Sequence, residues 1–346
     1  MNAKGSVFAI AMGAALAANS PAVEIEAAGS CAIELVVLGA GQDAGAPQIG
    51  NAGDDGPHLL PSSLGLIDRG EGARYLFDAT PAITQQLAML DAIEPPSDGS
   101  RDRLGLDGVF LTHAHIGHYL GLAYFGREAA NTSGLRVVAT MRMQRFLRNN
   151  GPWSQLVELD NIELPPLQRK PWAGPAAPGE WRLNQLIRLH GNISASPIPV
   201  PHRDEYSDTV GWTIYDTSNF SILYMPDIDG WEDWEARDDG TAIEEHIGKF
   251  DMLFVDATFW DDNELFDENG VGRDMNAIPH PRVTETMDRL QSLPASERAK
   301  VHFIHYNHTN PIRDPDSAES REVAERGFNV ARRGDRHCLV QGDIAE

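Results

Sequence analysis

The hydrophobic positions of the chain fall into short runs that are separated by glycine, proline and charged residues. Runs of this kind, bounded by turn residues, are typical of buried β-strands. They predict strands at 33–38, 63–68, 74–78, 106–111, 135–139, 193–200, 210–216, 220–225, 250–255 and 301–304. Apolar residues at helical spacing predict helices at 82–93, 119–130, 141–149 and 283–293.

The apolar run 106–111 leads directly into three closely spaced histidines, His113, His115 and His118. Because a predicted helix follows, these histidines lie on a strand-to-helix loop, where rigid scaffolds often present chemistry. Imidazole is the commonest protein ligand for zinc and also binds iron. The spacing therefore predicts a metal site, against the alternative of three surface histidines.

Three further apolar runs end close to a residue type that binds metals. These residues are His202, Asp227 and His305. Together with His113 they place a candidate ligand after each of four predicted strands. We therefore expect one composite site at the edge of a sheet sandwich.

The chain is strongly acidic. Lys and Arg total 28 against 51 for Asp and Glu, which gives a formal net charge of −23. A field of this sign repels polyanions, so nucleic acid is an unfavourable substrate and a small molecule is the expected partner. We attribute the acidity to a solubilising surface rather than to a specific cationic partner.

Residues 1–22 have the features of a secretory signal peptide. Lys4 supplies the positive start, residues 7–18 the apolar core, and Ala15-Leu16-Ala17 a small-x-small cleavage site. The apolar run is too short to span a bilayer, so we expect no stable membrane insertion after cleavage. This interpretation predicts a periplasmic or secreted protein with a single domain at 30–346. The alternatives are a disordered alanine-rich terminus and a cytoplasmic location.

The chain has 2 cysteines, Cys31 and Cys338, each beside a predicted terminal strand. In an oxidising compartment they would pair if those strands are neighbours. Two separate buried thiols are the alternative.

Several segments resemble the metallo-β-lactamase superfamily, and within it the coenzyme PQQ synthesis protein B family. They are the His-x-His-x-x-His element at 113–118 and the segments 41–48, 76–81, 256–260 and 303–311. The resemblance covers roughly residues 33–341. It implies an α/β fold, the metallo-β-lactamase-type αββα sandwich, in which two mixed sheets carry helices on their outer faces.

The same resemblance implies a site for one or two divalent metal ions, with zinc expected first and iron or manganese as alternatives. Carried over residue by residue, the first ion would be held by His113, His115 and His202. The second would lie beside His118 and His305, and Asp227 would bridge both.

The chain departs from the superfamily pattern at Gly117, where an aspartate usually binds the second metal. Losing an anionic ligand should weaken the second site. Either a single ion binds, or another carboxylate such as Asp229 completes the second site. Residues 51–61, where some relatives place cysteines, contain none, so we expect no cysteine-bound zinc there.

The expected activity is metal-assisted hydrolysis of an ester, lactone or phosphodiester. Asp227 would hold the attacking water, and His280 would protonate the leaving group. Alternatively, His280 is only a helix-entry residue between two prolines. Glu205, Tyr206 and His308 are candidate substrate-binding residues, although a solvated loop would also explain the first two.

Two other functions stay open. One is a non-haem iron oxygenase of PQQ or related cofactor biosynthesis, which the family resemblance suggests. The other is a non-catalytic periplasmic metal or cofactor binder that uses the same ligands. Three tryptophans, Trp231, Trp234 and Trp260, would form either an apolar substrate wall or part of the core.

Overall fold

A computed structural model describes residues 31–97, 99–165, 186–237, 242–266 and 270–342, and the predicted signal peptide at 1–22 lies outside these ranges. The strands are β1 Cys31–Gly39, β2 Ser63–Asp68, β3 Ala73–Phe77, β4 Gly108–Phe110, β5 Leu135–Val138, β6 Ile162–Glu163, β7 Ile187–Arg188, β8 Ile193–Pro199, β9 Val210–Asp216, β10 Phe220–Met225, β11 Met252–Asp256, β12 Val301–Ile304, β13 Asn329–Val330 and β14 Arg336–Gln341. The α-helices are α1 Ile83–Ile93, α2 Ile116–Tyr119, α3 Met141–Asn149, α4 Trp153–Glu158, α5 Trp231–Arg237, α6 Ile243–Ile247, α7 Val283–Leu290, α8 Ala295–Arg298 and α9 Ala318–Glu325.

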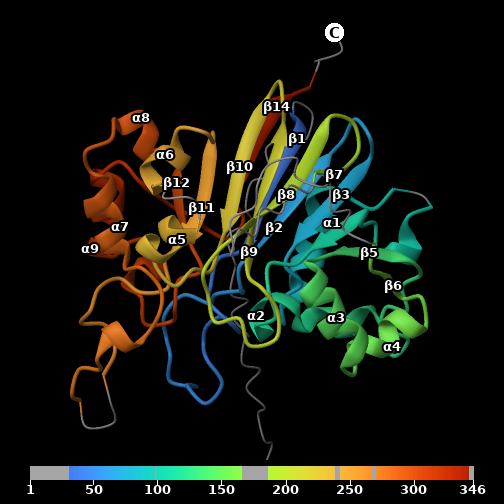
Figure 1. Ribbon diagram of the computed structural model, residues 1–346, viewed down its shortest axis with the longest axis horizontal. Helices are drawn as coiled ribbons and strands as arrows, with labels where there is room; N and C mark the ends of the chain where they lie inside the picture. The colour runs from blue at the N-terminus through green and yellow to red at the C-terminus, as the bar shows by residue number, and fades with distance from the viewer. Residues whose placement is uncertain (1–30, 98, 166–185, 238–241, 267–269, 343–346) are drawn as a thin grey trace, which may run out of the picture.

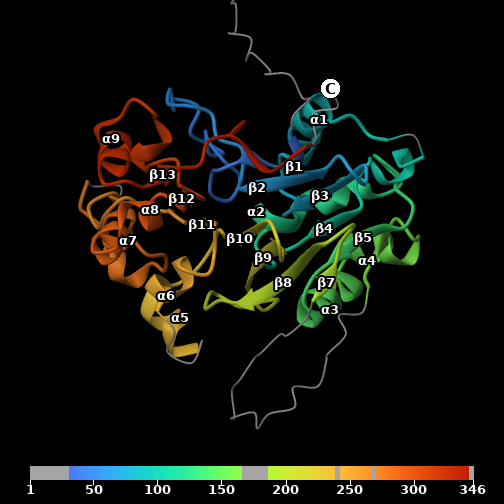
Figure 2. The same cartoon turned by 90° about the horizontal axis from the view of Figure 1, so that it is seen from above.

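The strands form two 7-stranded mixed sheets that pack face to face (Figure 1). Their orders are β14-β1-β2-β3-β4-β5-β6 and β13-β12-β11-β10-β9-β8-β7. Figure 2 shows α1, α3 and α4 on the outer face of the first sheet and α5 to α9 beside the second. This arrangement confirms the predicted αββα sandwich. Among the described helices, none combines the length and the apolar character needed to cross a bilayer.

Alternation along the strands builds the core. In β1, Leu35 and Val37 belong to the apolar cluster between the sheets, whereas Val36 and Leu38 belong to the cluster beneath the helices of the first sheet. Successive side chains of a strand point to opposite faces, so a continuous apolar run fits a sheet that is covered on both sides. Each fully buried leucine or valine contributes about 1.5–3 kcal/mol. The core thereby fixes the strand ends that carry the candidate ligands.

The predicted helix 119–130 is wrong in length and type. The α-helix α2 ends at Tyr119, and a 3₁₀ segment at Leu120–Phe125 follows it. The backbone N–H of Gly121 donates to the carbonyl oxygen of Ala79 at 2.9 Å. A Cβ atom on Gly121 would lie 2.2 Å from the carbonyl oxygen of Thr80. This backbone-to-backbone contact, which no periodicity reveals, decides the local structure.

The two cysteines form a disulfide, which resolves the alternative left open by the sequence. Cys31 lies in β1 and Cys338 in β14, and these strands pair antiparallel. The bond joins positions that are 307 residues apart in the chain, with the Cα atoms 5.6 Å from each other. It ties the edge strand of the first sheet to its neighbour.

Candidate metal centre

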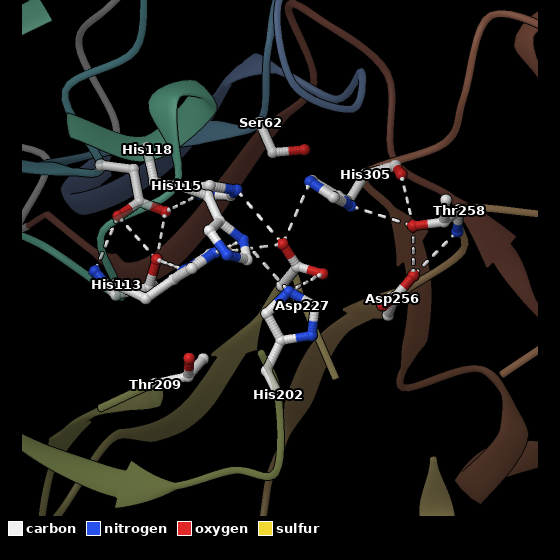
Figure 3. Close-up of polar contacts among 12 residues, drawn as sticks. Ser62, His113, His115, His118, His202, Thr209, Asp227, Asp256, Thr258 and His305 are labelled. Atoms are coloured by element: carbon white, nitrogen blue, oxygen red, sulfur yellow. Dashed lines mark hydrogen bonds and ion pairs between the residues drawn. The ribbon is translucent and has the colours of Figure 1, made fainter. Parts of the chain in front are cut away.

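The candidate ligands meet at one edge of the sandwich because several strands end there. His113 and His115 follow β4 of the first sheet, and the remaining ligands follow strands of the second sheet, except that His118 lies in α2. In the second sheet, β8 runs parallel to β10 and β12, so their carboxyl ends share an edge. Figure 3 shows the imidazole rings arranged around the carboxylate of Asp227.

The first group consists of His113, His115, His202 and Asp227, whose ligand atoms all lie within 4.8 Å of one another. The Nδ1 atom of His115 is 2.9 Å from Nε2 of His113 and 3.2 Å from Nε2 of His202. Asp227 approaches with Oδ2 at 3.2 Å from His113 and Oδ1 at 3.3 Å from His202. Two ligands of a tetrahedral zinc ion lie about 3.4 Å apart, so the spacing of this group fits such an ion.

The second group consists of His118, His305 and Asp227. The Oδ2 atom of Asp227 is 3.5 Å from Nε2 of His118 and 3.6 Å from Nε2 of His305. Both Nε2 atoms are buried without a hydrogen-bond partner among the described residues. Buried polar atoms almost always have a partner, and a divalent cation would satisfy both nitrogens and the carboxylate together. The residues present therefore fit a second ion.

The opposite ring nitrogens are held by other polar side chains. The contacts to Nδ1 are Thr112 Oγ1 at 3.0 Å for His113, Asp78 Oδ2 at 2.8 Å for His118, Asp229 Oδ1 at 2.8 Å for His202 and Thr258 Oγ1 at 3.1 Å for His305. Such contacts fix the orientation of a ligand ring and the nitrogen that faces the ion.

Asp78 is one of these partners, and the histidine motif alone does not indicate it. Its fully buried carboxylate accepts hydrogen bonds from the backbone N–H and the hydroxyl of Thr112 and from the hydroxyl of Tyr224. Burial opposes a charge on His118, but the carboxylates of Asp78 and Asp227 outweigh it and raise the pKa of His118 to about 10. The signal that points to Asp78 is its position at the end of the predicted strand 74–78.

Asp229 does not complete the second group, contrary to one alternative above. Its Oδ1 atom is 2.8 Å from Nδ1 of His202. The other ring nitrogen of His202, Nε2, is the one that faces the carboxylate of Asp227. The second group therefore has two histidines and one carboxylate among the described residues.

Gly117 leaves no room for the aspartate that the superfamily usually carries there. A Cβ atom on Gly117 would lie 2.8 Å from both the Cα atom and the carbonyl oxygen of Asp43. The glycine-rich loop that contains Asp43 packs closely against residues 59–61, because a Cβ atom on Gly45 would lie 2.1 Å from the carbonyl oxygen of Leu59. The close packing of this loop therefore explains why residue 117 is a glycine and not an aspartate ligand.

His280 lies within the site, not only at the start of a helix. Its Nδ1 atom is 2.7 Å from Oδ2 of Asp256 and 3.2 Å from Oδ1 of Asp227. Burial opposes a charge on this ring, but the two carboxylates outweigh it and raise the pKa of His280 to about 10. The imidazole is therefore held as a proton donor at neutral pH.

Backbone strain gathers at the site. Asp78, His280 and His305 have φ angles of 64°, 94° and 66°, which are rare for residues other than glycine. Each such conformation costs of the order of 1–3 kcal/mol and persists only where the surroundings enforce it. The fold accepts this cost at three residues that set the site geometry.

The electrostatic environment keeps Asp227 ionised. Burial alone would raise the pKa of its carboxyl, but the charges of His202 and His305 and the nearby rings of His113 and His118 hold that pKa well below its usual range. Burial also lowers the pKa of His113 well below its ordinary value. A neutral imidazole and an anionic carboxylate are the forms that bind a metal.

The three candidate substrate-binding residues differ in position. Glu205 is 3.0 Å from Nε2 of His115 through its Oε2 atom, so it borders the first group. Tyr206 is 62% exposed and stacks on Phe146 with ring centroids 5.2 Å apart. His308 is half-buried, bonds Asn307 Oδ1 through Nδ1 at 2.7 Å, and belongs to none of the ligand groups.

Of the three tryptophans, two lie in the core and do not form a substrate wall. Trp231 and Trp234 are 1% and 0% exposed and belong to the core. Their indole N–H groups donate to Thr286 and to the carbonyl oxygen of Pro199. Trp260 is partly buried against the same core.

A protein-family model described as a β-lactamase superfamily domain matches residues 73–306. The chain belongs to the metallo-β-lactamase superfamily. Within the superfamily it is PqqB-like, because it is 30% identical over 292 residues to the coenzyme PQQ synthesis protein B of Stutzerimonas stutzeri, covering 78% of this chain and 84% of that protein. The protein of the same name from Methylococcus capsulatus is 28% identical over 316 residues, with 85% and 96% covered.

Solved structures of this superfamily share the fold. Zn²⁺-bound PqqB from Methylobacterium extorquens superposes with a TM-score of 0.67 at 20% identity, covering 88% of this chain and 99% of that one. A diphosphatase of the PhnP family has a TM-score of 0.57 at 18% identity, with 88% and 96% covered. The short form of human tRNase Z has a TM-score of 0.51 at 14% identity, with 88% and 99% covered.

Proposed function

We propose that the chain is a metal-dependent hydrolase that cleaves an ester, lactone or phosphodiester of a small organic substrate. The observation that carries the proposal is the carboxylate of Asp227, which lies within 3.6 Å of histidines from both groups at converging strand ends. The presence of a diphosphatase and a tRNase among proteins of the same fold supports hydrolysis as the reaction class.

The residues that would hold the ions are those of the two groups, with zinc expected first. A divalent ion bound there would lower the pKa of a water molecule to about 7 and polarise the scissile carbonyl or phosphoryl group. Asp227, anionic and central, orients the attacking water and accepts its proton. His280, kept protonated by Asp256 and Asp227, donates a proton to the leaving oxygen.

The test compares His115→Ala with His58→Ala. His115 belongs to the first group, whereas His58 is exposed and lies in none of the ligand groups. We expect His115→Ala to lose bound metal and turnover together, measured by elemental analysis and by assays on ester, lactone and phosphodiester panels. His58→Ala should keep both. Unchanged hydrolysis by His115→Ala would refute the proposal.

A second candidate is a non-haem iron oxygenase. Gly117 reduces the second group to His118, His305 and Asp227, and two histidines with one carboxylate are the usual ligands of iron oxygenases. The names of the curated relatives, which refer to cofactor synthesis, agree with such a role. Bound iron with O₂ consumption would favour this candidate, whereas bound metal without either turnover would favour a binding protein.

We also propose a periplasmic or secreted location. The signal-peptide features of residues 1–22 support it, and so does the Cys31–Cys338 disulfide, because such bonds persist mainly in oxidising compartments. Cell fractionation with mass measurement of the mature N-terminus tests this location.

A further inference from the structure

A polar pocket lies at the end of β4 opposite the metal ligands. It has a volume of about 260 Å³, and its wall includes Asp107, which precedes β4, and Gly134, which precedes β5. His113 and His115 follow the other end of β4. The pocket is therefore separate from the metal centre.

Three arginines, Arg103, Arg136 and Arg188, line this pocket in a protein of net charge −23. Among the described residues, none of their guanidinium groups forms an ion pair or donates a hydrogen bond to another residue. Arg69 and Arg74, by contrast, have carboxylate partners, Glu34 and Asp91, both at 2.7 Å. The pocket thus gathers fixed positive charge whose donors are not used within the protein.

A histidine completes the wall of donors. The hydroxyl of Tyr75 accepts from the backbone N–H of His190 at 3.0 Å and is 2.7 Å from its Nδ1 atom. Tyr75 is 2% exposed, so the core holds the position of the His190 ring at the pocket. This contact engages Nδ1, and where the Tyr75 hydroxyl donates to Nδ1 the proton of a neutral ring lies on Nε2.

Asp107 is the one acidic residue of the described pocket lining. One of its oxygens, Oδ2, accepts from the backbone N–H of Arg74 at 3.0 Å. Within the lining itself, three arginines against one aspartate leave a surplus of two positive charges, while Asp68 and Glu71 lie just outside it, beside Gly191.

We propose that this pocket binds a phosphate group, either as inorganic phosphate or as the phosphoryl end of a small phosphomonoester. Guanidinium groups present forked donors that match the oxygens of phosphate, and charge-assisted hydrogen bonds are the strong ones. The volume lies just below the usual range of small-molecule pockets, which suits a single phosphate better than a large ligand. The metal centre takes no part in this binding.

The test is titration calorimetry on the full-length protein with inorganic phosphate and with glycerol 3-phosphate. We expect one bound phosphate per chain, and at least tenfold weaker binding in Arg136→Gln and in Arg188→Gln. Arg188 is exposed, so its variant keeps the fold. Arg321→Gln, in α9 of the opposite helix layer, is the matched control and should bind as the wild type does (Figure 2).

Phosphate that binds instead at the metal centre is distinguished with His115→Ala. The proposal requires this variant to retain phosphate affinity. Loss of binding in His115→Ala with unchanged binding in both pocket variants would overturn it, as would the absence of binding to the wild type. Whichever of inorganic phosphate and glycerol 3-phosphate binds with the lower Kd shows whether the pocket takes free phosphate or a phosphomonoester.

Discussion

Gly117 offers a test in which two physical effects predict opposite signs. It lies in α2, where replacing glycine by alanine normally stabilises a helix by about 1 kcal/mol. Here the added methyl group would stand 2.8 Å from two backbone atoms of Asp43, well inside ordinary contact distance. Inserting a methyl group into packed structure costs about 1–3 kcal/mol. We therefore expect Gly117→Ala to lower the free energy of unfolding by about 1 kcal/mol.

The assay is urea unfolding of metal-free protein, followed by tryptophan fluorescence. Gly248→Ala is the matched control, because its added methyl group would meet its nearest neighbour at an ordinary 3.7 Å. A Gly117→Ala protein that is more stable than the wild type by about 1 kcal/mol would refute the steric argument. If that argument holds, Gly117→Asp does not strengthen the second metal site, since the loop at Asp43 occupies the required space.

Two further predictions address the buried polar groups. Asp78→Asn removes the charge that holds His118. We therefore expect the metal affinity of the second group, measured by chelator competition, to fall about 10–100-fold. A variant that binds metal as tightly as the wild type would contradict this role of Asp78. Burial, with repulsion from His337, lowers the pKa of His302 to about 3, below its ordinary value near 6.5, so the unfolded chain takes up a proton first as the pH falls. The free energy of unfolding that this buried neutral ring contributes at neutral pH is lost between about pH 6.5 and 3, and about 2 kcal/mol of it is lost by pH 5. The free energy of unfolding of His302→Phe should therefore fall less than that of the wild type between pH 7.5 and 5. An equal fall in both proteins would contradict the assignment.

The sequence predicted those parts of the site that have a local signal. The spacing of His113, His115 and His118 needs no tertiary information, and His202 and Asp227 each follow an apolar run. The αββα sandwich itself came from family resemblance, because strand order depends on contacts between distant segments. The local sequence pattern therefore identified candidate ligands, but it could not predict how the fold brings them together.

What escaped prediction depends on contacts across the chain. Asp78 meets His118 over 40 positions, and Thr258 meets His305 over 47. The overlong helix at 119–130 failed for the same reason, since the contact of Gly121 with Ala79 competes with helical spacing. The role of Asp229 on His202 likewise required the folded geometry.

The bond between Cys31 and Cys338 turns nearly the whole described chain into a covalent ring. A protease that cuts one surface loop within this ring opens it but releases no fragment, so both halves stay tethered at the strand pair β1 and β14. The same proximity makes the described fold suited to circular permutation, with new ends in an exposed loop and a short linker from the end of β14 to the start of β1.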